Sequence, residues 1–187
     1  MLLSYFFLVL SAVAGTLSVH VLDIGQGDSV LIQSPEGKVV LIDGGTGSVN
    51  VVPYLQSLNI EEINLMIGTH AHADHIGGLD DVINTFPVKV YLDNGMPHTT
   101  RTYNSLMKLI EDKDITYITA TNGRIFTLGS EVTLEVLHPQ DRLLQNTRSD
   151  LNSNSVVIRL STPIEMRAIS GCTACKKRCE LLWFEPW

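Results

Sequence analysis

Residues 65–79 read LMIGTHAHADHIGGL, and this stretch decides the fold. Residues 65–68 are apolar, as in a buried strand, and the residues after position 75 favour a helix. Between them lies the motif HAHADH, residues 70–75. A loop that joins a strand to a helix at the carboxyl edge of a sheet is where α/β proteins place their functional sites. The stretch therefore predicts a functional site at such an edge.

The polar side chains of this motif suit a divalent metal. Alternate residues of an extended loop point the same way, so His70 and His72 can converge on one ion. Asp74 and His75 then turn towards a second position as the helix begins. Imidazole and carboxylate ligands suit Zn²⁺, Mn²⁺ or Fe²⁺, and two ions would hold both the attacked and the leaving oxygen. We predict one or two divalent ions at these four residues; a solvated loop without metal is the alternative.

The rest of the chain predicts one α/β domain. Apolar runs separated by a turn at residues 35–38 indicate a β-hairpin near the N-terminus. Strands before helices, followed by alternation, predict a mixed sheet layered with helices. Strands are expected at 19–23, 30–33, 39–42, 65–68, 88–91, 115–118, 131–137 and 155–160, and helices around 52–58, 76–86 and 103–110.

Composition narrows the possible partners. The chain has 187 residues, 44% of them hydrophobic, with a net charge of −7. Such a chain lacks the broad basic surface of a nucleic-acid binder. A phosphodiester substrate stays possible, because bound metal ions can supply local positive charge. No stable protein partner is predicted.

The N-terminal segment predicts export. Residues 2–10 form an apolar run, and Ala12-Val13-Ala14 resembles a signal-peptide cleavage site. We expect cleavage after Ala14. The alternative is that the run is the end of a membrane helix, because by itself it is too short to span a bilayer. Both interpretations place the domain outside the cytoplasm, secreted or periplasmic, and any membrane association would come through this segment.

The motif is similar to the H-x-H-x-D-H hallmark of the metallo-β-lactamase superfamily. Four flanking segments narrow the resemblance to the metallo-β-lactamase domain of ComEC-type DNA-internalisation competence proteins, and together they cover roughly residues 18–161. They are residues 19–29 (VHVLDIGQGDS), 41–45 (LIDGG), 75–79 (HIGGL) and 151–158 (LNSNSVVI). The resemblance implies an αββα sandwich with a metal site at one edge, and a metal-dependent hydrolase, with phosphodiester or nucleic-acid cleavage as the leading reaction.

The resemblance also implies individual roles. Asp74 would bind a second metal and orient the nucleophilic water, which makes it the catalytic residue. Asp28 lies in a loop that the family places close to the site, although a turn residue is the alternative. The segment Asn152–Ser155 likewise resembles a family loop near the site, with a β-turn as the alternative.

Other polar residues are judged from their position alone. Asp43 ends a strand before two glycines, so we expect it to order the histidine loop by hydrogen bonds. His138 ends another strand, where it is either structural or within reach of the metal edge. His20 and His98 are interpreted as an ordinary strand histidine and a surface histidine.

The chain departs from the family after residue 161. The family continues with a strand ending in Thr-Gly-Asp, whose aspartate bridges the metals, and later supplies a further histidine ligand; neither occurs here. Residues 162–187 instead form an atypical tail with Cys172, Cys175 and Cys179, interpreted as without function or as a substitute thiolate site. We therefore expect domains at 1–14, 15–161 and 162–187 and a sandwich incomplete at its C-terminus. The alternative to an active hydrolase is a non-catalytic remnant that binds metal weakly.

Overall fold

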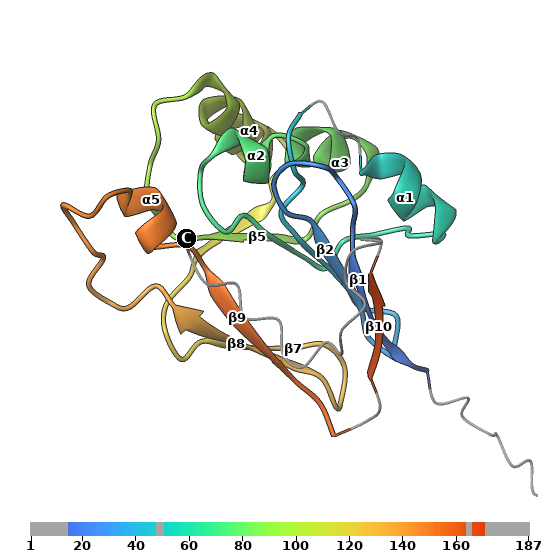
Figure 1. Ribbon diagram of the computed structural model, residues 1–187. Helices are drawn as coiled ribbons and strands as arrows, with labels where there is room; N and C mark the ends of the chain where they lie inside the picture. Colours follow the sequence, from blue (N-terminus) through green and yellow to red (C-terminus); the bar gives the residue numbers. More distant parts are fainter. Residues whose placement is uncertain (1–14, 48–50, 164–165, 171–187) are drawn as a thin grey trace, which may run out of the picture.

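The computed structural model describes residues 15–47, 51–163 and 166–170 of the chain. Seven strands form the larger sheet, shown in Figure 1. In spatial order they are β10 (Met166–Ser170), β1 (Leu17–Val21), β2 (Val30–Gln33), β3 (Val39–Ile42), β4 (Leu65–Ile67), β5 (Val90–Asp93) and β6 (Thr116–Thr119). The pairs β1–β2 and β2–β3 are antiparallel, whereas β3 to β6 run parallel. The expected mixed sheet is therefore confirmed.

Three antiparallel strands form a smaller sheet in the order β7 (Ile125–Thr127), β8 (Thr133–His138) and β9 (Val157–Ser161). The short strand β7 was not expected from the sequence, because three residues are too few to show a period. The turn before β8 is held against the β2–β3 turn, since Glu36 accepts hydrogen bonds from the amide and the hydroxyl of Ser130. This contact ties the two sheets together at one end.

Four helices cover one face of the larger sheet in Figure 1. They are α1 (Val52–Ser57), α2 (Ala73–Ile76), α3 (Leu79–Thr85) and α4 (Arg101–Asp112), while α5 (Asp150–Ser153) precedes β9. The expectation of one helix over 76–86 is wrong, because the chain breaks between α2 and α3 at Gly77 and Gly78. A β-carbon on Gly77 would lie 2.6 Å from the backbone nitrogen of Gly47, so the break lets two backbone segments pack closely.

The larger sheet is buried on both faces, as parallel sheets usually are. Leu31 and Leu41 face the helices and belong to the core cluster beneath them. Val40 and Ile67 face the other way and pack against the smaller sheet. The described residues thus supply three layers of the expected sandwich: helices, larger sheet and smaller sheet. On the smaller sheet Ile125 is 60% exposed.

The segment expected to be an atypical tail contributes a strand. β10 pairs in parallel with β1 over five residues, from Leu17 opposite Met166 to Val21 opposite Ser170. No periodicity predicted this strand; its place at the end of the sheet requires pairing on one side only. The expected signal peptide and the three cysteines lie outside the described residues.

Within the ranges that the structure describes, no helix combines the length and the apolar character needed to cross a bilayer.

Candidate metal centre

The histidine motif lies where the sequence placed it, at the carboxyl edge of the parallel strands. Asp43 directly follows β3, and Thr69 and His70 follow β4 after Gly68. Backbone hydrogen bonds continue the sheet up to this point, from the amide of Asp43 to Ile67 and from the amide of Gly68 to Leu92. The strands therefore deliver these polar residues side by side at one edge of the sheet.

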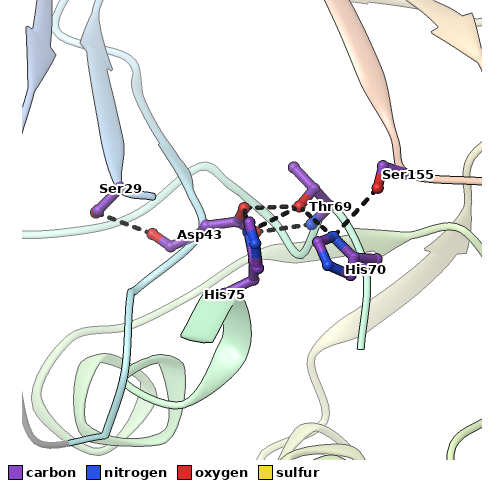
Figure 2. A network of polar contacts seen from close by, with 6 residues as sticks. All are labelled: Ser29, Asp43, Thr69, His70, His75 and Ser155. Atoms are coloured by element: carbon purple, nitrogen blue, oxygen red, sulfur yellow. Dashed lines mark hydrogen bonds and ion pairs between the residues drawn. The ribbon is translucent and has the colours of Figure 1, made fainter. Parts of the chain in front are cut away.

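Asp43 organises this edge. Its side chain is 1% exposed, and its backbone has a φ of 57°, a left-handed conformation that aspartate tolerates better than most residues. One carboxylate oxygen, Oδ1, accepts the amide proton of Thr69 (2.7 Å), and Oδ2 accepts the hydroxyl of Thr69 (2.6 Å). Oδ2 also accepts the Nδ1–H of His75 at 2.7 Å, as Figure 2 shows. The expected ordering of the histidine loop by Asp43 is confirmed.

The protons of this network can be counted. The hydroxyl of Thr69 donates its proton to Asp43. Towards His70 this hydroxyl can therefore only accept a hydrogen bond. His70 Nδ1 lies 3.2 Å from that hydroxyl oxygen and 3.2 Å from the hydroxyl oxygen of Ser155. The proton of His70 therefore belongs on Nδ1, as it does in His75. In both rings this leaves the lone pair of Nε2 available to a metal ion.

The histidine rings gather closely, but they do not close into a complete coordination shell. The ring centroids of His70 and His75 are 4.0 Å apart, and those of His70 and His72 are 4.8 Å apart. Among the residues that the structure describes, no three histidine, cysteine or carboxylate side chains converge as a bound ion would require. The donor types and the tautomers fit a metal; the described ligand set amounts to part of a site.

The glycine loop between β1 and β2 packs against the motif. A β-carbon on Gly27 would lie 1.7 Å from the backbone oxygen of Asp74, so only glycine permits this approach. The backbone oxygen of Asp28 accepts the amide of Gly45, which fixes the same loop to the end of β3. Asp28 is therefore close to the site, as the resemblance implied.

The segment before β9 also contacts the histidine loop. Beyond the contact of Ser155 with His70, the amide of Val156 donates to the backbone oxygen of Thr69 (2.9 Å). Asn154 is fully buried, and its side chain bonds the backbone of Leu144 through both its oxygen and its nitrogen. This segment consists of the short helix α5 and the residues that lead from it to β9. The sequence NSNS, residues 152–155, had indicated that the segment lies near the site.

Three histidines lie outside the motif: His20, His98 and His138. His138 Nε2 contacts the backbone oxygen of Ser153 (3.0 Å), which matches the structural alternative. His20 is buried in β1, with Nδ1 2.9 Å from the hydroxyl of Tyr54. His98 differs from expectation, because it is half-buried and its ring lies edge-on to His72 with centroids 6.2 Å apart. The nearness of His98 to His72 was not predicted from the sequence, since 26 positions separate the two residues.

Burial and charge move the pKa values of the two loop histidines in opposite directions. Burial, reinforced by the positive charge of His75, lowers the pKa of His70 to about 4. Burial also lowers the pKa of His75, but its hydrogen bond to Asp43 and the charges of Asp43, Asp74 and Asp28 outweigh that effect and raise it. The metal-free edge thus holds a neutral His70 beside a readily protonated His75.

Comparison with known proteins agrees with this geometry. The family model described as the metallo-beta-lactamase superfamily matches residues 22–101, which include the motif and the Asp43 strand end. The metallo-beta-lactamase from Staphylococcus aureus subsp. aureus COL superposes with a TM-score of 0.51 at 19% identity, over 79% of this chain and 39% of that one. Residues 22–101 of this chain are therefore similar to the metallo-β-lactamase superfamily, and the likeness to the solved structure is one of fold.

Two curated proteins are similar to part of this chain. ComE operon protein 3 of Bacillus subtilis (strain 168) is 31% identical over 90 residues, which cover 38% of this chain and 12% of that protein. The uncharacterized protein YcaI of Escherichia coli (strain K12) is 32% identical over 77 residues, covering 37% of this chain and 10% of that protein. This chain therefore matches about a tenth of the length of either curated relative.

The contact of Gly27 with α2 predicts a difference between two glycines of one loop. Both have positive φ, 76° for Gly25 and 84° for Gly27, so alanine at either should cost about 1–2 kcal/mol of backbone strain. A β-carbon on Gly25 meets nothing within 4 Å, whereas one on Gly27 collides with Asp74. Urea unfolding should therefore show a clearly larger loss for Gly27→Ala than for the control Gly25→Ala. Equal losses would mean that the loop does not pack against the motif.

The two histidines should titrate separately in the metal-free chain. Imidazole NMR should place the pKa of His70 near 4 and that of His75 above its ordinary value. As pH falls from about 6.5 to 4, the unfolded chain protonates His70 and the folded chain does not, so this residue lowers stability there. His75 acts oppositely: its stabilisation is complete below about 6.5 and is lost as pH rises through its raised pKa.

The variant His70→Asn isolates the first effect. It should lose less stability than the parent chain between pH 6.5 and 4, because the depressed pKa of His70 is removed. A common titration of both rings near the ordinary value would contradict the assigned network.

Proposed function

We propose that this chain carries the metal-binding part of an extracytoplasmic metallohydrolase of the phosphodiesterase or nuclease type. The observation that supports this most is the fixed state of the two loop histidines. Asp43 holds the Nδ1 proton of His75, and Thr69 with Ser155 holds that of His70. Because the proton of each ring is on Nδ1, both rings keep the Nε2 lone pair available to a cation before one binds.

The residues proposed to hold metal are His70, His72, Asp74 and His75. When bound, the ion would lower the pKa of a water molecule to about 7 and stabilise charge on the reacting oxygens. The protein's own part is to fix the imidazole tautomers and to place the Asp74 carboxylate beside them, where the superfamily resemblance assigns it the orientation of the attacking water. Zinc and manganese both suit this mixture of imidazole and carboxylate.

The substrate class rests on the resemblance to ComEC-type proteins and on the similarity to ComE operon protein 3. The net charge of −7 suits a site in which bound metal, rather than a basic surface, attracts an anionic substrate. A phosphodiester, either a nucleic-acid backbone or a smaller ester, is the substrate class we propose.

A second candidate, a remnant that binds metal weakly and does not catalyse, is favoured by one observation. The described residues do not bring three ligands together. Neighbouring cations need enough ligands to offset their mutual repulsion, so this edge alone should retain at most one ion, through His70 and His72.

The proposed location outside the cytoplasm rests on the apolar residues 2–10 and the Ala12-Val13-Ala14 sequence. The chain produced in a secreting host should begin at Gly15. N-terminal sequencing that finds Met1 would contradict the signal-peptide interpretation.

The two candidates differ in metal content and activity. We expect the 187-residue chain to retain at most one divalent ion after dialysis and to cleave bis-nitrophenyl phosphate little or not at all with Mn²⁺ or Zn²⁺. Fusion to the second half of a family member should restore cleavage, and Asp74→Ala should then abolish it. Asp81→Ala, an exposed aspartate on α3, is the matched control and should leave cleavage unchanged.

A different result would contradict the expected low metal content and low activity. Two tightly held ions, together with robust cleavage by the unmodified chain that is lost on Asp74→Ala, would show that residues outside the described ranges supply the missing ligands. The cysteines at 172, 175 and 179 would be the first to replace.

A further inference from the structure

His98 lies beside the histidine motif, at the edge of the sheet where Asp43 and Thr69 are placed, but it does not belong to that motif. It follows β5, in the loop that leads into α4, and its half-buried ring meets His72 edge-on. The ring centroids are 6.2 Å apart with an interplanar angle of 88°. His98, which follows β5, is thus a neighbour of the site that β3 and β4 carry.

The hydroxyl of Thr100 fixes the orientation of this ring. Thr100 caps α4, since its side-chain oxygen accepts the amide proton of Tyr103. The same oxygen lies 2.9 Å from Nδ1 of His98. A hydroxyl that accepts from Tyr103 can also donate its own proton, and we assign that donation to Nδ1 of His98. That arrangement gives the hydroxyl a partner for both of its roles, and it leaves the proton of a neutral His98 on Nε2.

We propose that His98 is a substrate-contacting residue, whose Nε2–H donates a hydrogen bond to a phosphoryl oxygen of a phosphodiester held beside His72. The proposal rests on the proposed function, and it adds a specific donor for the anionic substrate. A neutral donor suits a place where metal supplies the charge, because it fixes the direction of an oxygen without competing for the ion. The state assigned to His98 is opposite to that of His70 and His75, which keep Nε2 free for metal.

The first arm of the test reads the tautomer directly. Long-range ¹H–¹⁵N NMR of the metal-free, 187-residue chain should show the proton of His98 on Nε2, whereas His70 should carry its proton on Nδ1. Thr100→Ser, which keeps the hydroxyl, should leave the His98 tautomer unchanged, and Thr100→Val should disturb it. A proton on Nδ1 of His98 in the parent chain would overturn the proposal, since Nε2 would then be an acceptor.

The second arm uses dimethyl phosphate, the smallest phosphodiester, titrated into the Zn²⁺-supplemented chain and followed by NMR. His98→Ala should weaken its binding about fivefold, the loss expected for one neutral hydrogen bond, while zinc affinity stays unchanged. His98→Gln, which places an N–H near the position of Nε2, should recover most of the affinity.

The outcomes separate this proposal from the proposed function. Equal binding by the parent chain and His98→Ala would overturn the role of His98 and leave the metallohydrolase intact. Loss of zinc by His98→Ala would mean that this ring is a metal ligand, which also overturns it. A parent chain that takes up neither zinc nor dimethyl phosphate would contradict the proposed function, and the role of His98 with it.

Discussion

The buried carboxylate of Asp43 is the constraint on which the metal edge depends. Three hydrogen bonds, two from Thr69 and one from His75, satisfy a group that would be costly to bury alone. The same bonds hold the loop after β4 to the end of β3 and set which nitrogen of each ring carries a proton. A histidine ligand whose other nitrogen donates to a carboxylate is the usual arrangement in metal proteins, so one residue serves both folding and the proposed chemistry.

Close backbone packing makes this network possible. The amide of Gly44 donates to the backbone oxygen of His75 at 2.7 Å, and the amide of Gly78 donates to that of Gly45. Gly27 adds a third such approach, against Asp74. Backbone contacts therefore pack the end of β3, the loop after β1 and helix α2 closely around the histidines, and a side chain at Gly27 would collide with Asp74.

Much of this was predictable, and the failures have physical causes. Long apolar runs identified β2 and β3 to the residue, because burial on both faces leaves a strong local signal, and the motif lies at the carboxyl edge of the sheet, as its place after an apolar strand predicted. The break between α2 and α3 was missed, since helical spacing continues across Gly77 and only tertiary contact with Gly47 reveals why it stops. β7 and β10 were missed because short or terminal strands depend on their partners. His98 was misjudged because its proximity to His72 arises from the alignment of β4 and β5.

The central claim is that Asp43 prepares the histidines for metal, and Asp43→Asn tests it most directly. Asparagine keeps the size of the side chain and tolerates the positive φ, but its amide cannot accept from Thr69 and His75 at both ends. Zinc titration of the purified chain, with circular dichroism as the control for folding, should show affinity about 10–100-fold below that of the parent. An unchanged zinc affinity in a folded Asp43→Asn chain would contradict the account.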